Sequence, residues 1–123
     1  MRHLFVCREY PPAAYLPGGI GTYVRHIAAL LARAGETVHV IAHRWDGAPE
    51  AREESLGGRL VVHRLALDEP VDAAHAPERS ADGLVLRGML GSSFPSQAFA
   101  WQAALLAERL IVQEEIDVIE GQE

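Results

Sequence analysis

The chain has 123 residues, of which 49% are hydrophobic and 23% charged, as expected for one soluble globular domain. The formal net charge of -6 argues against non-specific binding to nucleic acid, so no nucleic-acid partner is expected. No apolar run approaches the roughly 20 residues of a membrane span, and the N-terminus resembles no signal peptide. All eleven basic residues are arginine, which excludes a Schiff-base or P-loop lysine within the chain. Cys7 is the only cysteine, so no intramolecular disulfide can form.

The first third of the chain predicts a strand, a loop, a helix and a second strand. A short apolar run at residues 3–7 is typical of a buried parallel strand, and a loop rich in proline and glycine follows it. Apolar residues at three- and four-residue steps predict an amphipathic helix over residues 21–34, with Gly35 as its C-terminal cap. The β-branched run at residues 37–42 predicts the second strand. The apolar stripe of this helix comprises Ile20, Tyr23, Val24, Ile27, Leu30, Leu31 and Ala34.

The remainder of the chain predicts two more strands and one long helix. Residues 43–58 are expected to form a polar loop, and the acidic run at 50–54 a solvated surface. Strands are predicted at residues 59–67 and 116–120, with a long loop at 68–93 and a helix at 95–115. The helix has one apolar row of Phe99, Ala103, Leu106 and Leu110, and a second of Ala98, Trp101, Leu105 and Val112. This order predicts the α/β class, a Rossmann-like open parallel sheet with flanking helices and strand order 3-2-1-4.

The segment with the most chemical information is the glycine loop, Gly18-Gly19-Ile20-Gly21, before the first helix. Glycine lets the main chain turn tightly and leaves its amides open to a ligand. A helix N-terminus adds unpaired N–H donors and a partial positive charge, which favour an anion such as phosphate. The local pattern gives equal weight to a simple turn into the helix. A dinucleotide fingerprint fits poorly, because its third glycine would fall at Val24 and its loop follows the strand at once.

Other polar and aromatic residues give weaker signals. His39 and His43 lie four residues apart, but without partner cysteines or a close acidic cluster they favour strand-end polar residues over a zinc site. No metal site is therefore expected. Tyr10 and Tyr15 lie in the first loop, where an aromatic ring could stack on a sugar, and plain packing is an equal alternative for both.

Several of these segments together resemble one family. They are Tyr10-Pro11-Pro12, the glycine loop with its helix, and the helix end Ala34-Gly35-Glu36 before the second strand. In this order they resemble the N-terminal, acceptor-side domain of retaining glycosyltransferases with the GT-B fold, of the glycogen-synthase-like "group one" or family 4 type. Residues 117–123 are also similar to the family's strand that ends at the acceptor cleft, whereas residues 43–115 fit in layout only.

The resemblance implies a hexosyltransferase with two Rossmann-like domains and an active site between them. The N-terminal domain would bind a sugar or lipid-linked acceptor, and the C-terminal domain a UDP- or GDP-sugar donor, with no metal ion required. Gly19 and Gly21 match the glycines whose amides face the donor diphosphate or the transferred sugar, and Gly18 shapes the turn. Glu120 and Gln122 match the acceptor side, where many relatives have a histidine that this chain lacks.

The resemblance also sets expectations for the whole protein. Residues 1–123 would be a partial N-terminal domain, a truncated half of a GT-B enzyme without its donor-binding domain, and inactive alone. A truncated sheet would expose an edge through which the chain could self-associate. The cytoplasm is the expected location, with the inner membrane face as a peripheral site for the parent protein. Two alternatives stay open: a non-catalytic binding module for a phosphorylated ligand or partner protein, and an NAD-dependent or sugar-nucleotide-modifying enzyme.

Overall fold

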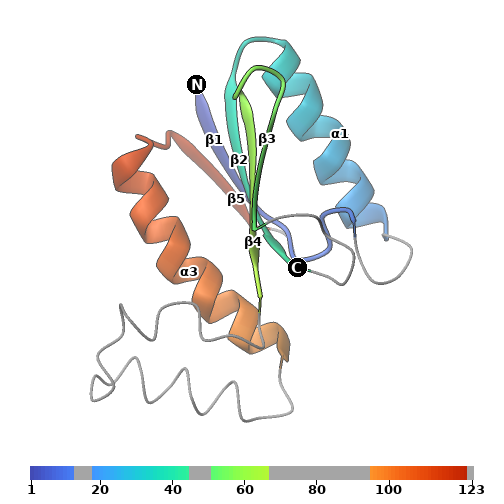
Figure 1. Ribbon diagram of the computed structural model, residues 1–123, viewed down its shortest axis with the longest axis vertical. Helices are drawn as coiled ribbons and strands as arrows, with labels where there is room; N and C mark the ends of the chain where they lie inside the picture. Colours follow the sequence, from blue (N-terminus) through green and yellow to red (C-terminus); the bar gives the residue numbers. More distant parts are fainter. Residues whose placement is uncertain (13–17, 45–50, 67–94, 122–123) are drawn as a thin grey trace.

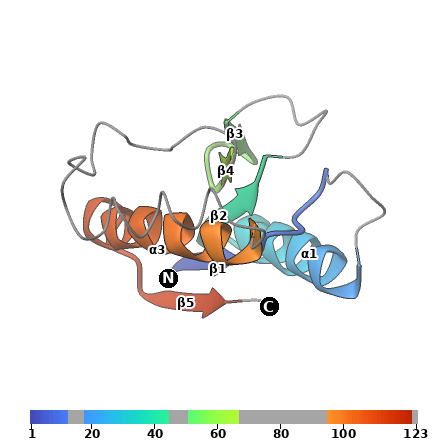
Figure 2. The same cartoon turned by 90° about the horizontal axis from the view of Figure 1, so that it is seen from below.

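The structure, a computed structural model, describes residues 1–12, 18–44, 51–66 and 95–121. These residues form an open sheet between two long helices, with α1 on one face and α3 on the other (Figure 1). The strands follow the order β3-β4-β2-β1-β5, so the β3–β4 hairpin and β5 lie at opposite edges (Figure 2). This is the predicted α/β, Rossmann-like architecture. The predicted long loop at residues 68–93 lies outside the described residues.

Four of the strands are parallel and confirm the predicted order. They are β1 (Arg2–Val6), β2 (Thr37–His43), β4 (Leu60–Leu65) and β5 (Val118–Gly121). β1 pairs with β2 on one side and with β5 on the other, and β4 pairs with the far side of β2. Parallel strands are joined by crossover segments that cover the faces of the sheet, so their residues are apolar on both sides. β2 is the clearest example, with five consecutive buried residues between two half-buried ends.

The prediction of a loop over residues 43–58 is wrong at its end. There β3 (Arg52–Ser55) runs antiparallel to β4 and pairs Ser55 with Leu60. The turn between them uses left-handed main chain at Leu56, Gly57 and Gly58, with φ of 53°, 68° and 81°. Charged residues are uncommon in strands, but an edge strand can turn them to solvent. The Gly-Gly pair was the available signal for this hairpin.

The helix α1 (Gly19–Arg33) confirms the predicted helix but presents a different stripe to the sheet. Its buried residues are Gly21, Val24, Ala28 and Ala32, with Ile27 and Leu31 packed beside them. Four members of the predicted stripe are instead exposed: Ala34, and the larger Ile20 at 38%, Tyr23 at 49% and Leu30 at 60%. The small side chains let the helix approach the sheet closely, and this favours their face over the bulkier one. Gly35, at φ 98°, ends the helix as predicted.

The helix α3 (Pro95–Gln113) covers the opposite face. Its predicted row of Phe99, Ala103, Leu106 and Leu110 packs against Leu4, Ile41 and Leu65 of the sheet, which confirms that row. The second predicted row is only partly covered, because Val112 is 77% exposed. After α3, Asp117 fixes the start of β5: its carboxylate accepts from the Arg2 amide and its own amide donates to the Arg2 carbonyl, both at 2.8 Å. In the described ranges, neither helix is long and apolar enough to cross a membrane.

Candidate functional site

The carboxyl ends of the parallel strands meet at one edge of the sheet, where ligands bind in open α/β folds. Main-chain hydrogen bonds join the segments that leave this edge. The Cys7 amide donates to Ile41 at 2.9 Å, the His43 amide to Arg8 at 3.3 Å, and the Arg44 amide to Leu65 at 2.8 Å. The first turn of α1 lies at this same end of the sheet (Figure 1). The fold therefore brings the glycine loop to the expected edge.

The first turn of α1 is open to an incoming ligand. Gly18 is the N-cap residue, with extended main chain and no side-chain cap hydrogen bond, and the first turn contains no acidic residue. Gly18 and Gly19 are exposed, and a Cβ added to Gly19 would meet no atom within 4 Å. Gly21, by contrast, is buried against the sheet. The exposed amides at this helix end are suited to an anionic group.

An acidic side chain lies beside this turn. A Cβ added to Gly18 would lie 3.2 Å from the Glu9 Oε2 atom, so glycine leaves room for that carboxylate. Glu9 belongs to the segment after β1, which connects the centre of the sheet to the glycine loop. A carboxylate near a helix N-terminus interacts favourably with the helix dipole and repels a second anion there. The position of Glu9 therefore influences how well the turn accepts a negatively charged ligand.

The next residue, Tyr10, packs in the core rather than at the surface. Its side chain is 6% exposed and joins the cluster between α1 and the sheet. The Arg64 guanidinium lies over its ring, 5.7 Å from the centroid. Burial raises the pKa of the Tyr10 hydroxyl, with the nearby Arg64 charge acting in the opposite direction. The structure thus places Tyr10 where it supports the loop, and its predicted contact with a sugar stays a prediction.

Arg64 is the buried cation of this region, and sequence reasoning did not identify it. Its side chain lies on the α1 side of β4, where it donates to the Pro11 carbonyl at 2.7 Å and the Tyr10 carbonyl at 3.4 Å. Glu53 of β3 lies 3.6 Å from the Arg64 Nη2 atom. Burial lowers the pKa of Arg64 and the Glu53 carboxylate raises it, but an arginine stays charged at any physiological pH. These residues line a pocket of about 300 Å³ with Pro12 and Arg25.

A second polar cluster lies on the α3 side of the sheet. His39 Nδ1 and His63 Nε2 are 3.1 Å apart, their rings are stacked, and Glu114 of α3 lies 3.8 Å from His39 Nε2. Burial is the main cause that lowers the pKa of both histidines, to about 4 for His63. Sequence spacing paired His39 with His43. The actual partner is on a neighbouring strand, which only the strand register reveals.

The described residues contain no group of three or more histidine, cysteine or acidic side chains arranged to hold a metal ion. Cys7 is a core residue, since its side chain is 1% exposed. Burial raises the pKa of its thiol to about 11, which keeps the thiolate scarce near neutral pH. A buried thiol with a raised pKa is a poor nucleophile, so the structure does not favour Cys7 as a catalytic residue.

The residues predicted for the acceptor side lie in different surroundings. Glu120 is a half-buried residue of β5, paired with Phe5 of β1 one residue before the end of the strand. Tyr10 is buried on the α1 side of the sheet. Tyr15 and Gln122 lie outside the described residues. The carboxyl end of β5 and the segment after β1 lie at the same edge of the sheet, and the acceptor role of these residues stays a prediction.

Comparison with known families identifies the chain. Residues 17–123 match the family described as Glycosyltransferase Family 4, and this range includes the glycine loop and, among the elements that the structure describes, both helices and four of the five strands. The chain belongs to Glycosyltransferase Family 4. This confirms the resemblance to an N-terminal GT-B glycosyltransferase domain. No curated protein and no solved structure gives a significant match.

Proposed function

We propose that this chain is the acceptor-side half of a retaining glycosyltransferase. The reaction would move a hexosyl group from a UDP- or GDP-sugar to a sugar or lipid-linked acceptor, without a metal ion. The observation that carries the proposal is the open first turn of α1, at the ligand edge of a sheet in a chain of Glycosyltransferase Family 4. The rest of the donor site would belong to a second domain.

The first turn of α1 has a direct physical role in this reaction. When the bond between sugar and diphosphate breaks, negative charge develops on the leaving diphosphate. Amides already directed at that position stabilise the charge without reorganising, and a closed site strengthens their effect. Gly19 suits this role because a side chain there would stand between the helix amides and the phosphate oxygens. Glu120 is proposed as an acceptor contact from the end of β5.

The test is a transfer assay on the full protein that contains this chain, with a panel of UDP- and GDP-sugars and release of nucleoside diphosphate as the readout. Gly19→Ala should raise the donor KM or lower kcat by at least about tenfold, because the methyl group obstructs the phosphate approach. Gly121→Ala is the matched control, since its added methyl group also meets no atom within 4 Å. The control should leave the donor KM unchanged.

Three results would contradict the proposal in different ways. Absence of transfer with every donor, together with binding of a phosphorylated ligand or a partner protein, would favour the non-catalytic module. Binding of NAD instead would favour a dinucleotide enzyme. Transfer with inversion, shown by NMR of the product anomer, would refute the retaining mechanism alone. The chain of residues 1–123 by itself is proposed to be inactive, and measurable turnover by it would refute that point.

A further inference from the structure

We propose that Arg64 is a positioning residue for sugar transfer. It fixes the loop of residues 8–12 against the β3–β4 hairpin, and so keeps the Glu9 carboxylate in a set place beside the first turn of α1. The inference rests on the proposed function for its effect on catalysis, since it requires the donor diphosphate to meet that turn. Arg64 itself would not touch the donor.

The contacts of Arg64 with the loop are specific and buried. Two nitrogens of the guanidinium donate to two successive carbonyls, those of Tyr10 and Pro11. The guanidinium also stacks over the Tyr10 ring, and the Tyr10 amide donates to Cys7 at 3.3 Å. Arg64 is 4% exposed, so water does not replace these contacts. The loop is thus held by a planar fork that a lysine ammonium cannot reproduce.

The other side of Arg64 is equally fixed. Its amide donates to the Ala51 carbonyl at 2.7 Å, and the strand pairing of β4 with β2 and β3 sets its main chain. Glu53 of β3 pairs with Val62 of β4, and its carboxylate lies 3.6 Å from the Arg64 guanidinium. The hairpin therefore acts as the fixed support from which Arg64 holds the loop.

The position of the loop of residues 8–12 determines where the Glu9 carboxylate lies relative to the first turn of α1. Glu9 immediately precedes Tyr10, and its Oε2 atom lies 3.2 Å from where a Gly18 Cβ would be. If the loop loosens, the carboxylate can move over the helix amides, which attract it through the helix dipole. It would then compete with the donor diphosphate for the same amides. Loss of Arg64's fork should therefore weaken donor binding through Glu9.

The experiment measures donor KM and kcat in the full protein for Arg64→Lys, with the acceptor saturating. Donor KM should rise about tenfold with a smaller change in kcat, since misplacement by about 1 Å is enough for effects of this size. Adding Glu9→Gln to Arg64→Lys should return donor KM to within about twofold of wild type. Arg52→Lys is the matched control, because Arg52 is 54% exposed and pairs with Glu54 two residues away on the same strand.

Unchanged donor KM in Arg64→Lys would overturn the inference. So would a rise that Glu9→Gln does not relieve, because a purely structural role predicts no such rescue. If Arg64→Lys fails to fold, Glu53→Gln serves instead, with a rise in donor KM of about twofold to threefold and the same rescue expected.

Failure of the proposed function is distinguishable from failure of this inference. If the wild-type protein transfers no sugar from any donor, the catalytic part of both proposals falls. The loop-fixing part is then decided by hydrogen exchange at the Tyr10 amide, which should be at least about tenfold faster in Arg64→Lys than in wild type. Equal exchange rates in the two proteins would overturn it.

Discussion

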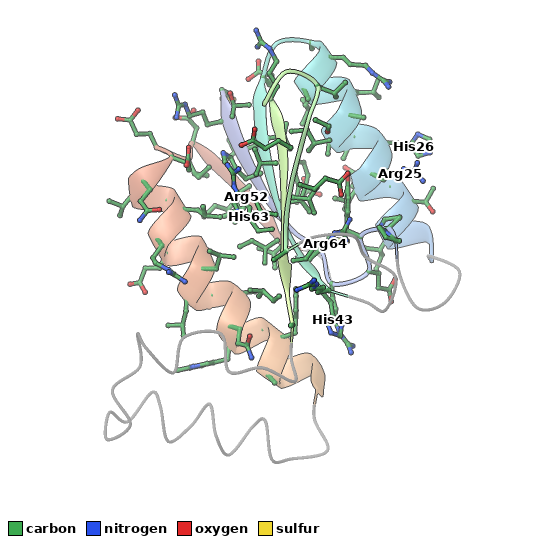
Figure 3. The ribbon with its side chains drawn as sticks, in the orientation of Figure 1. Arg25, His26, His43, Arg52, His63 and Arg64 are labelled. Atoms are coloured by element: carbon green, nitrogen blue, oxygen red, sulfur yellow. The ribbon has the colours of Figure 1, made fainter. Side chains whose placement is uncertain are left out.

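The two sides of β4 carry polar residues that differ in charge: a buried cation on one side and a half-buried neutral imidazole on the other. Arg64 and its neighbour His63 lie on opposite sides of the strand (Figure 3). Arg64, on the α1 side, keeps its charge, whereas the lowered pKa of His63, beside His39 on the α3 side, leaves that imidazole neutral near pH 7. Both side chains leave the same strand within one residue of each other and both lose water. Their charge states differ mainly because the ordinary pKa of arginine is far above neutral and that of histidine is close to it, while burial lowers both. Carbonyl and carboxylate oxygens surround Arg64, and a second imidazole lies next to His63.

Charged residues of the β3–β4 hairpin change the pKa on both sides of β4, raising it at Arg64 and lowering it at His63. Glu53 of β3 favours the charged form of Arg64, while the Arg52 charge lowers the pKa of His63 further. A short edge strand with alternating charges therefore supports a cation on one face and a neutral pair on the other. Burial lowers the pKa of both groups, and the Glu53 carboxylate offsets only part of that effect at Arg64.

The largest expected effect on stability comes from replacing Arg64, the cation on the α1 side. Arg64→Met should lower the free energy of unfolding by about 3 kcal/mol, because the Tyr10 and Pro11 carbonyls lose a charged donor while still shielded from water. Urea denaturation of the full protein measures this. Arg52→Met, at an exposed site, should change stability by less than about 0.5 kcal/mol. Equal effects of the two substitutions would show that burial of Arg64 has no energetic importance.

The neutral pair on the α3 side should make stability depend on pH. The pKa of His63 is about 4 in the folded protein and 6.5 when free of these contacts, so the unfolded chain binds more protons between these values. Stability should therefore be full above about pH 6.5 and fall as pH decreases toward 4, by about 2 kcal/mol once the partial exposure of His63 is allowed for. Denaturation midpoints from pH 4 to 8 measure the slope.

Two variants test whether His63 causes this pH dependence of stability. His63→Gln removes the titrating group and keeps a hydrogen-bonding partner for His39, so the pH dependence should flatten. His26→Gln changes an exposed residue of α1 and should leave it as in wild type. An unaltered slope in His63→Gln would show that other groups cause the acid sensitivity.

A smaller loss of stability is expected from a substitution in the turn between β3 and β4. Gly57 has φ of 68° and open space where a Cβ would be, so Gly57→Ala adds only main-chain strain. The cost should be about 1 kcal/mol. Exchange should quicken at the Leu60 and Arg64 amides, because Leu60 pairs with Ser55 and the Arg64 amide donates to Ala51 at the start of the hairpin. Unchanged exchange at both amides would mean that this turn does not hold the hairpin.

Much of the fold could be predicted from the sequence, because apolar runs, helical periodicity and glycines at turns and helix ends are local signals. The four parallel strands and their order followed from such signals. β3 was missed because its charged residues, such as Arg52 and Glu53, are typical of loops unless the pairing strand is known. The stripe of α1 was misplaced because small residues can face a sheet as well as bulky ones, as Ala28 and Ala32 do.

The candidate site was predictable only in part. The glycine loop could be found because Gly18 and Gly19 are neighbours in sequence, and a family resemblance supported them. Arg64 and the His39–His63 pair depend on register between strands, which no local pattern specifies. Their contacts join residues 24 to 54 positions apart. The sequence therefore indicated the ligand edge but not the side chains that shape it.

The most direct test of the account is hydrogen exchange at the amides of Gly19 and Ile20 in the full protein, with and without a saturating UDP- or GDP-sugar donor. The account predicts that the donor slows exchange at these amides by about tenfold or more, because they donate to phosphate oxygens. The effect should be absent in Gly19→Ala. Donor binding that leaves these amides unchanged would contradict the claim that the first turn of α1 receives the diphosphate.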